Sequence, residues 1–283
     1  MRRQMPRKSI LQKTVLILLF IGGTFPLLYF ALVEIGIAQS SQDSAQTGEG
    51  RDSFDRYVEN VAFGVGETLV YDVNYGFINA GSATMEVARL IEFENRPCYQ
   101  VVTRAQSNSF FSTFYKVDDR VESVVDAIGL FSWRFEKNLR EGSYRADRMY
   151  TFDQRRHVAY DRDDTIATPA FVQDALSVLF YVRAQELKPG MSLFIDNFTD
   201  GKNYPLEVRV LKKEKVDVKA GTFDCLVVEP LLQSVGVFKH EGQLRVWLTD
   251  DRLKLPVLMK SKILVGSIAA ELTEYQLGDI ESF

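Results

Sequence analysis

The sequence predicts a mainly β fold: an antiparallel sheet that curves or closes into a barrel-like domain, with one amphipathic helix inserted in it. Apolar and polar residues alternate in many short runs, turn residues separate these runs, and a single segment repeats its apolar residues with a helical period. Many short strands without intervening helices are typical of an antiparallel sheet. Of the 283 residues, 46% are hydrophobic and 25% are charged, a composition that suits a globular domain with a core.

Residues 1–38 form a separate N-terminal segment with a basic head, a long apolar run and a small-residue exit. The uncharged run over 15–33 is longer than the roughly 7–15 apolar residues of a signal peptide and close to the roughly 20 that span a bilayer. The segment is therefore a signal peptide cleaved after Ala38, which we favour, or an anchor that keeps residues 15–33 in the inner membrane. Both interpretations place the rest of the chain in the periplasm or another extracytoplasmic space.

The remainder divides into a polar linker and lead-in over 39–63 and a β domain over 64–283. Between Gln39 and about Ser53 almost no residue can be buried, as in a solvated linker. Without residues 1–38 the chain carries 29 basic and 37 acidic side chains. This negative charge excludes nucleic acid as a partner that the overall field would attract.

The strands follow from alternation. In the first, over 69–77, Tyr71 and Val73 share one face, whereas Asp72 and Asn74 share the other. Further strands are predicted near 81–91, 98–106, 115–125, 130–140, 143–152, 204–212, 223–229, 243–249, 255–263 and 268–277. In the hairpin that starts at residue 130, we expect charged residues such as Glu136 and Arg140 on the exposed face, in ion pairs across the strands.

One helix is predicted over 168–188. Thr168 can cap it, Pro169 suits its first turn, and Lys188-Pro189-Gly190 ends it. The apolar residues between these signals recur with the period of a helix. We expect the apolar face to pack against the sheet or to plug one mouth of the barrel.

Three short motifs of the first half recur in the same order in the second half. They are Glu86-Val87 and Glu207-Val208, Cys98 with Val101-Val102 and Cys225 with Val227-Val228, and Asp118-Asp119-Arg120 and Asp250-Asp251-Arg252. An internal duplication and chance matching of common strand residues explain the recurrence equally well. The two cysteines either form a disulfide, as an even pair in an oxidising compartment can, or are buried as small hydrophobic residues, which we favour.

The motifs of common catalytic and metal sites are absent from the sequence, including Gly-x-Ser-x-Gly, the phosphate-binding loop and His-Glu-x2-His. Only His157 and His240 could ligate zinc through imidazole, too few for a site without distant cysteines. Adjacent strand residues point to opposite faces, so Asp118 and Asp119 cannot act on one substrate together. The sequence predicts no catalytic residue, no metal ligand and no cofactor.

Several motifs together resemble one family. They are Gly66-Glu67-x-Leu69-x-Tyr71-x-Val73-x-Tyr75, Phe114-Tyr115-Lys116-Val117-Asp118-Asp119-Arg120-Val121-Glu122-Ser123, Asp174-x-Leu176-Ser177-x-Leu179, Ala220-Gly221-Thr222-Phe223-Asp224-Cys225 and Trp247-Leu248-Thr249-Asp250-Asp251. In this order they resemble the DUF3108 family of exported bacterial proteins of unknown function, over about Gly64 to Leu277. The resemblance implies an extracytoplasmic β-rich domain and supplies no catalytic residue.

Aromatic residues remain as candidates for a binding cavity. They are Phe110, Phe111, Phe114 and Tyr115, which cluster in the chain, and Phe180 and Tyr181 on the predicted helix. A curved sheet with a helix over its mouth can enclose an apolar cavity for a lipid or another amphiphile. We therefore expect a non-enzymatic protein of the cell envelope that binds a hydrophobic ligand or an envelope partner.

Two other functions stay open, namely a hydrolase or transferase acting on envelope glycan or lipid, and a protein-protein scaffold. The interior should discriminate among the three. A wide apolar cavity favours the binding protein, converging carboxylates favour the enzyme, and a solid interior favours the scaffold.

Overall fold

The computed structural model describes residues 56–162, 164–232, 244–262, 266–281 and 283. The predicted export segment and most of the predicted linker lie outside these residues. Fourteen strands form one antiparallel sheet in the order β8-β7-β6-β5-β4-β3-β2-β1-β14-β13-β12-β11-β10-β9, which confirms the mainly β prediction. No helix within the described ranges is long and apolar enough to cross a membrane.

The elements are β1 Thr68–Tyr75, β2 Ile78–Phe93, β3 Arg96–Ser107, α1 Ser109–Ser112, β4 Asp118–Asp126, β5 Ser132–Glu141, β6 Tyr144–Asp153, β7 Val158–Asp161, β8 Asp164–Ala167, α2 Ser177–Arg183, β9 Ser192–Thr199, β10 Lys202–Val218, β11 Gly221–Leu232, β12 Leu244–Thr249, β13 Pro256–Lys262 and β14 Ser267–Gln276.

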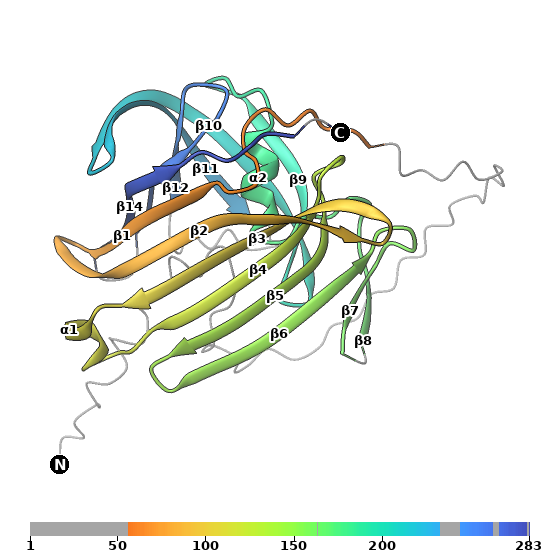
Figure 1. Ribbon diagram of the computed structural model, residues 1–283, viewed down its shortest axis with the longest axis horizontal. Helices are drawn as coiled ribbons and strands as arrows, with labels where there is room; N and C mark the ends of the chain where they lie inside the picture. Colours follow the sequence, from red (N-terminus) through yellow and green to blue (C-terminus); the bar gives the residue numbers. More distant parts are fainter. Residues whose placement is uncertain (1–55, 163, 233–243, 263–265, 282) are drawn as a thin grey trace, which may run out of the picture.

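The sheet curls on itself without closing, because β8 and β9 are its two edges and do not pair with each other. Figure 1 shows β2–β6 as one wall and β9–β12 as the opposite wall, with α2 between them. The chain between β8 and β9 links the two walls: the amide of Gln173 donates to Asp196 O on β9 at 2.9 Å, and the amide of Ser132 on β5 donates to Val172 O at 3.2 Å. This segment therefore covers the opening that the sheet leaves.

The N-terminal and C-terminal strands of the domain pair with each other in the middle of the sheet. Strand β1 pairs with β14 from Thr68 opposite Gln276 to Tyr75 opposite Ile268. A bridge between Val65 and Asp279 extends this contact. The first and last strands of the domain are thus neighbours.

Helix α2 is shorter than the predicted helix over 168–188, so that prediction is wrong in its bounds. Phe171 has a φ of 56°, in the left-handed region that a helix cannot contain. The carboxylate of Asp174 accepts the amides of Leu176 at 2.7 Å and Ser177 at 2.8 Å, so the helical turns begin only there. The buried face of α2 includes Phe180, which packs in the main core.

Four further elements lie outside the predicted set. Strands β7 and β8 have four residues each, too few to show alternation, and β9 contains the unbroken apolar run Leu193–Ile195. Helix α1 is a single turn whose start is capped by Asn108. The predicted strand over 115–125 begins only at Asp118, because the residues before it follow α1 around the mouth of the barrel.

The register does not support an internal duplication. Glu86 of β2 lies opposite Val102 of β3. In the second half, Glu207 of β10 lies opposite Leu231 of β11, three residues beyond Val228, its expected partner. The motif matches therefore do not occupy equivalent places in the two hairpins.

Candidate functional site

A cleft of about 60 Å³, measured as space open to water-sized molecules, lies at the end of the barrel that carries α1. Its walls come from β1–β4, β14 and the segment around α1. The apolar and aromatic lining residues are Val73, Tyr75, Ala80, Ala105, Phe111, Tyr115, Val117 and Ile268, and the polar ones include Ser82, Gln106, Ser107 and Asp119. A smaller cavity of about 10 Å³ lies against the same Ala105 and Asp119 and is also lined by Tyr71 and Met259.

Helix α1 is held at the mouth of this cleft by polar contacts. The side chain of Asn108 accepts the amide of Phe111 at 2.9 Å and donates to Asn79 O in the β1–β2 region at 2.8 Å. The amide of Asn108 donates to Ala80 O at 2.9 Å. These contacts fix the short helix on the β1–β2 hairpin, so Phe111 stays in the cleft wall.

The structure divides the predicted aromatic candidates. Phe111 and Tyr115 line the cleft, whereas Phe110 and Phe114 are 64% and 67% exposed beside it. Phe180 is fully buried in the core, with its ring centroid 4.8 Å from that of Phe63.

Tyr181 lies apart from the cleft aromatics. The guanidinium of Arg56 lies 4.7 Å from the centroid of its ring. Of the six candidates, the structure therefore brings together only the group over 110–115.

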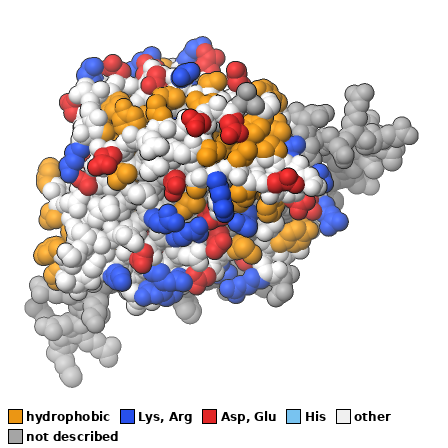
Figure 2. All heavy atoms as spheres, viewed as in Figure 1, with side chains coloured by type: hydrophobic (Ala, Val, Ile, Leu, Met, Phe, Trp, Pro, Cys, Tyr) orange, Lys and Arg blue, Asp and Glu red, His pale blue; other side chains and the backbone are white. Residues whose placement is uncertain are grey.

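Two more exposed apolar residues lie near α1. Phe77 and Ile78 at the β1–β2 turn are fully and 57% exposed. We call Phe77, Ile78, Phe110 and Phe114 the apolar rim, because α1 is bound to the β1–β2 hairpin through Asn108. Figure 2 shows hydrophobic side chains along the edge of the molecule where Figure 1 places the β1–β2 turn and α1. Contact between apolar side chains and water is unfavourable. A group of exposed apolar side chains at one end of the molecule therefore indicates a contact surface.

Asp119, which lines the cleft, forms a carboxyl pair with Glu141, which is not one of the lining residues. Asp119 of β4 and Glu141 of β5 are each 6% exposed. Burial, the charge of Asp119 and a hydrogen bond between the two carboxyls raise the pKa of Glu141 to about 8. Burial also raises the pKa of Asp119. The amide of Arg140, which donates to the Asp119 carboxylate at 2.7 Å, opposes this rise. The pair therefore holds a shared proton near neutral pH.

The groups around the pair leave it without a cationic partner. Within the described ranges, no lysine or arginine nitrogen lies within 4.0 Å of either carboxyl in an ion pair. The nearby Lys137 is buried and pairs with Asp200 instead. The Oε1 atom of Glu141 is buried and has no hydrogen-bond partner. Burial and the two carboxyl charges raise the pKa of Tyr115 to about 12, so its phenol stays neutral.

This pair was not among the predicted site residues, although the sequence of β5 carries a signal for it. Glu136 and Arg140 were predicted on the exposed face, and the Arg140–Asp147 ion pair at 2.7 Å confirms that face. Lys137 and Glu141 point to the opposite face of β5, together with the buried Phe135 and Leu139. A lysine and a glutamate on the apolar face of a strand are unusual enough to indicate a site. Asp118 is exposed while Asp119 is buried, as their adjacency predicted.

Glu141→Gln should stabilise the protein at high pH. Glu141 has its usual pKa of 4.5 in the unfolded chain and a pKa of about 8 in the folded protein. Between these two pH values the folded state therefore binds more protons than the unfolded state. The free energy of unfolding therefore falls as the pH rises through this window. Glutamine cannot ionise and can donate to Asp119. A change of 1 kcal/mol in the free energy of unfolding shifts Tm by about 2–4 °C in a domain of this size. The fall in Tm between pH 5 and pH 8 should therefore be about 5 °C smaller in Glu141→Gln than in the wild type.

Thermal unfolding followed by circular dichroism at both pH values measures this difference. Glu136→Gln, on the other face of the same strand, is the matched control and should keep the wild-type dependence. Equal pH dependence in wild type and Glu141→Gln would contradict the prediction.

The two cysteines are both buried and free. Cys98 lies in a small cluster with Val124, Phe131 and Trp133, whereas Cys225 lies in the main core. The structure does not bring them together. Burial raises the pKa of both thiols to about 12, so neither is a reactive thiolate near neutral pH.

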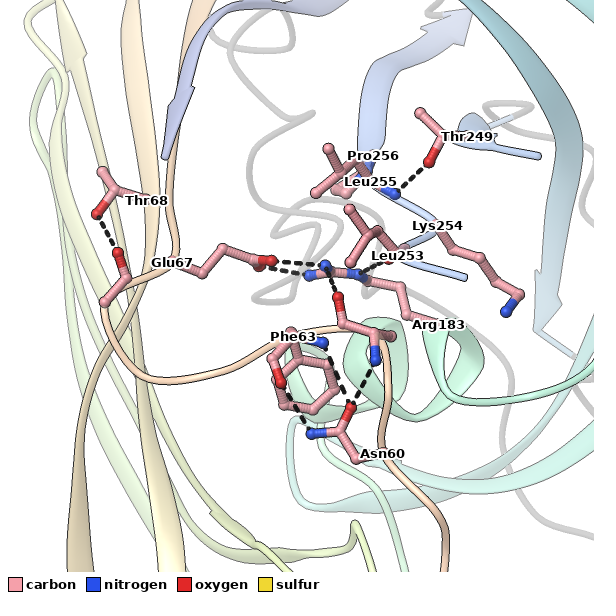
Figure 3. Close-up of polar contacts among 12 residues, drawn as sticks. Asn60, Phe63, Glu67, Thr68, Arg183, Thr249, Leu253, Lys254, Leu255 and Pro256 are labelled. Atoms are coloured by element: carbon pink, nitrogen blue, oxygen red, sulfur yellow. Dashed lines mark hydrogen bonds and ion pairs between the residues drawn. The ribbon is translucent and has the colours of Figure 1, made fainter. Parts of the chain in front are cut away.

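A buried ion pair occupies the opposite end of β1 from the apolar rim. Figure 3 shows the guanidinium of Arg183 on α2 between the carboxylate of Glu67 and the carbonyl of Leu253. Nη1 and Nη2 of Arg183 donate to the two carboxylate oxygens of Glu67 at 2.6 and 2.7 Å, and Nη2 also donates to Ala62 O at 3.0 Å. We call these contacts the Arg183 clasp. The rings of Phe63 and Phe180 each lie with their centroids 5.4 Å from the guanidinium carbon, so the clasp is enclosed and leaves no room for a ligand.

Comparison with solved structures supports the fold. A β-barrel-like protein of domain of unknown function DUF1849 from Brucella abortus is 12% identical, with a TM-score of 0.54 over 77% of this chain and 100% of that chain. A candidate exported protein with a YmcC-like fold from Bacteroides fragilis is 15% identical, with a TM-score of 0.30 over 78% and 99%. A DUF1089 family protein from Pseudomonas aeruginosa is 11% identical, with a TM-score of 0.34 over 76% and 95%. Only the first score carries weight, and it concerns the fold alone.

Comparison with curated proteins gives no match. The family model described as "Protein of unknown function (DUF3108)" matches residues 70–273. Apart from Gly66, Glu67 and Leu69 at the start of the first motif, this range contains the motifs on which the resemblance depended, and the chain therefore belongs to the DUF3108 family.

Proposed function

We propose that this is an exported, non-enzymatic protein of the cell envelope that binds the apolar part of an amphiphile at the cleft and the apolar rim. The observation that carries the proposal is the position of the rim, four exposed apolar side chains on the two elements that also form the cleft mouth. The basic and apolar segment over 1–38 supports export.

The size of the cleft limits what enters it. A cavity of about 150 Å³ holds a molecule such as benzene, whereas the cleft offers about 60 Å³. The cleft therefore accepts one end of an amphiphile, while the rest of the molecule lies against the apolar rim. The main core packs the interior beyond it. The wide apolar cavity expected of a ligand-binding protein is therefore not found among the described residues, and the proposal rests on the apolar rim and the mouth of the cleft instead.

The double substitution Phe110→Ser and Phe114→Ser should lower the affinity for 1-octanol about tenfold. Burying one phenylalanine side chain contributes roughly 1.5–3 kcal/mol, and a partial contact by each ring amounts to the roughly 1.4 kcal/mol of a tenfold change. Isothermal titration calorimetry of the full chain, purified from a Gram-negative host in its exported form, measures the affinity.

Phe194→Ser is the matched control, because Phe194 is 73% exposed on edge strand β9, away from α1. It should leave the affinity unchanged. The proposal fails if wild type does not bind 1-octanol, or if the control weakens binding as much as the double variant.

A further inference from the structure

We propose that the Asp119–Glu141 carboxyl pair is the head-group subsite of the cleft, and that the amphiphile bound there carries a primary ammonium group. This inference rests on the proposed function and adds the chemical class of the ligand. It concerns the inner side of the cleft, whereas the proposed function depends on the apolar rim.

The first reason is the unbalanced negative charge of the pair. Both carboxyls are buried, and a buried carboxylate without a cation or sufficient donors is strongly unfavourable. Lys137 is already engaged with Asp200, and Oε1 of Glu141 has no partner. A primary ammonium group supplies a positive charge and three donors, which are the two things that the pair lacks.

The second reason is the position of Asp119 relative to empty space. Asp119 lines both the cleft and the smaller cavity behind it, so its carboxylate is accessible from the mouth. Tyr115 and Val117 line the cleft. Val117 also forms a β-bridge with Glu141 at the end of β5, so this lining segment contacts the strand that carries the second carboxyl. A ligand atom in the cleft therefore lies beside Asp119, and it acts on Glu141 through the hydrogen bond between the two carboxyls.

The third reason is the aromatic lining. Phe111 and Tyr115 face the cleft together with Asp119. Aromatic rings attract cations through the negative charge of their faces, and rings combined with carboxylates are a recurrent cation site. Tyr115 also packs so closely on Gly142 that a Cβ there would lie 2.7 Å from its ring, which fixes the ring in the wall.

The dimensions suit a small head group. A cavity needs about 10–15 Å³ of space open to water-sized molecules to hold one water molecule, so the cleft of about 60 Å³ holds an ammonium group with its first methylenes. The alkyl chain then leaves through the mouth and lies against Phe110 and Phe114 of the apolar rim.

Binding should release a proton. The carboxyl pair shares one proton when empty, and an ammonium beside it favours ionisation of both groups. The other charged or titratable groups that act on the pair are Tyr115, Lys137 and Arg140, with Asp118 on the outer face of β4. Lys137 keeps its ion pair with Asp200, so the released proton comes from the carboxyl pair.

The test compares n-octylammonium, 1-octanol and n-octanoate below their micelle concentrations. Isothermal titration calorimetry at pH 7 in phosphate and in imidazole, neither of which contains a primary ammonium group, gives the affinity and the number of protons released. We expect n-octylammonium to bind at least tenfold more tightly than 1-octanol, with proton release. Asp119→Asn should abolish this preference.

Two further variants make the test specific. Asp118→Asn changes the adjacent, outward carboxylate and should leave both affinities unchanged. Glu141→Gln should still prefer n-octylammonium, through Asp119, but should release no proton. If Asp119→Asn does not fold, the missing proton release in Glu141→Gln tests the inference in its place.

The inference is overturned if wild type prefers 1-octanol or n-octanoate, or if Asp118→Asn and Asp119→Asn behave alike. Binding of 1-octanol without any preference for n-octylammonium would overturn the head-group subsite and leave the proposed function standing. Failure of all three compounds to bind would overturn both.

Discussion

Arg183→Met should lower the free energy of unfolding by about 3–5 kcal/mol, because it leaves the buried carboxylate of Glu67 without its cation. The guanidinium and the carboxylate are almost fully excluded from water, at 0% and 2% side-chain exposure. The carbonyls of Ala62 and Leu253 lose their donors at the same time. Since 1 kcal/mol corresponds to about 2–4 °C in a domain of this size, Tm should fall by about 10 °C or more.

Urea unfolding followed by tryptophan fluorescence measures this loss. Lys188→Met breaks an exposed ion pair with Glu186 near the same helix and should leave the unfolding midpoint unchanged within error. The double variant Glu67→Gln and Arg183→Met should be more stable than Arg183→Met alone, because no unpaired buried charge remains. A loss no larger than that of Lys188→Met would show that the Arg183 clasp does not stabilise the fold.

Asp174→Ala should destabilise the protein by about 3 kcal/mol or more. The Asp174 carboxylate is fully buried and accepts hydrogen bonds from the hydroxyls of Ser123 and Ser132 and from two amides at the start of α2. Each buried donor that loses its acceptor costs about 1–3 kcal/mol. The same carboxylate also joins β4 and β5 to the segment that covers the opening of the sheet, so the loss should affect tertiary structure and the helix together.

Chemical denaturation measures the loss for Asp174→Ala. Asp196→Ala is the matched control, because Asp196 lies on β9 with an exposed side chain and its backbone contact with Gln173 survives the substitution. Asp174→Asn keeps one acceptor oxygen and should fall between wild type and Asp174→Ala. Equal stability of the two alanine variants would contradict the role of Asp174.

The strands could be predicted because alternation is a local property of the sequence. Strands β1–β3, β5 and β6 lie close to their predicted ranges, β4 begins three residues late, and in β5 the buried and half-buried positions alternate strictly from Trp133 onward. The bounds of α2 could not be predicted in the same way. Thr168 and Pro169 form a plausible helix start, and only the tertiary contacts of Asp174 with Ser123 and Ser132 move that start to Ser177.

The cleft depends on contacts between residues distant in the sequence and was therefore only partly predictable. Phe111 and Tyr115 were candidates by composition, but their position beside Asp119 follows from the pairing of β2, β3 and β4. The close approach of β2 to β3 requires Gly81, where a Cβ would lie 2.1 Å from Gln106 O. By contrast, the inward parity of Glu141 was present in the sequence and could have been read from β5.

The pairing of β1 with β14 has a consequence for the order of folding. Every other neighbouring pair in the sheet consists of strands consecutive in the chain, so these hairpins can form with short loops. Strand β1 meets β14 only when the two ends of the domain come together, at the entropic cost of closing a very long loop. Contacts between distant residues slow folding, so this one step should govern how long the protein remains incompletely folded after synthesis. During that time, the edges of β1 and β14 are open to strands of other chains.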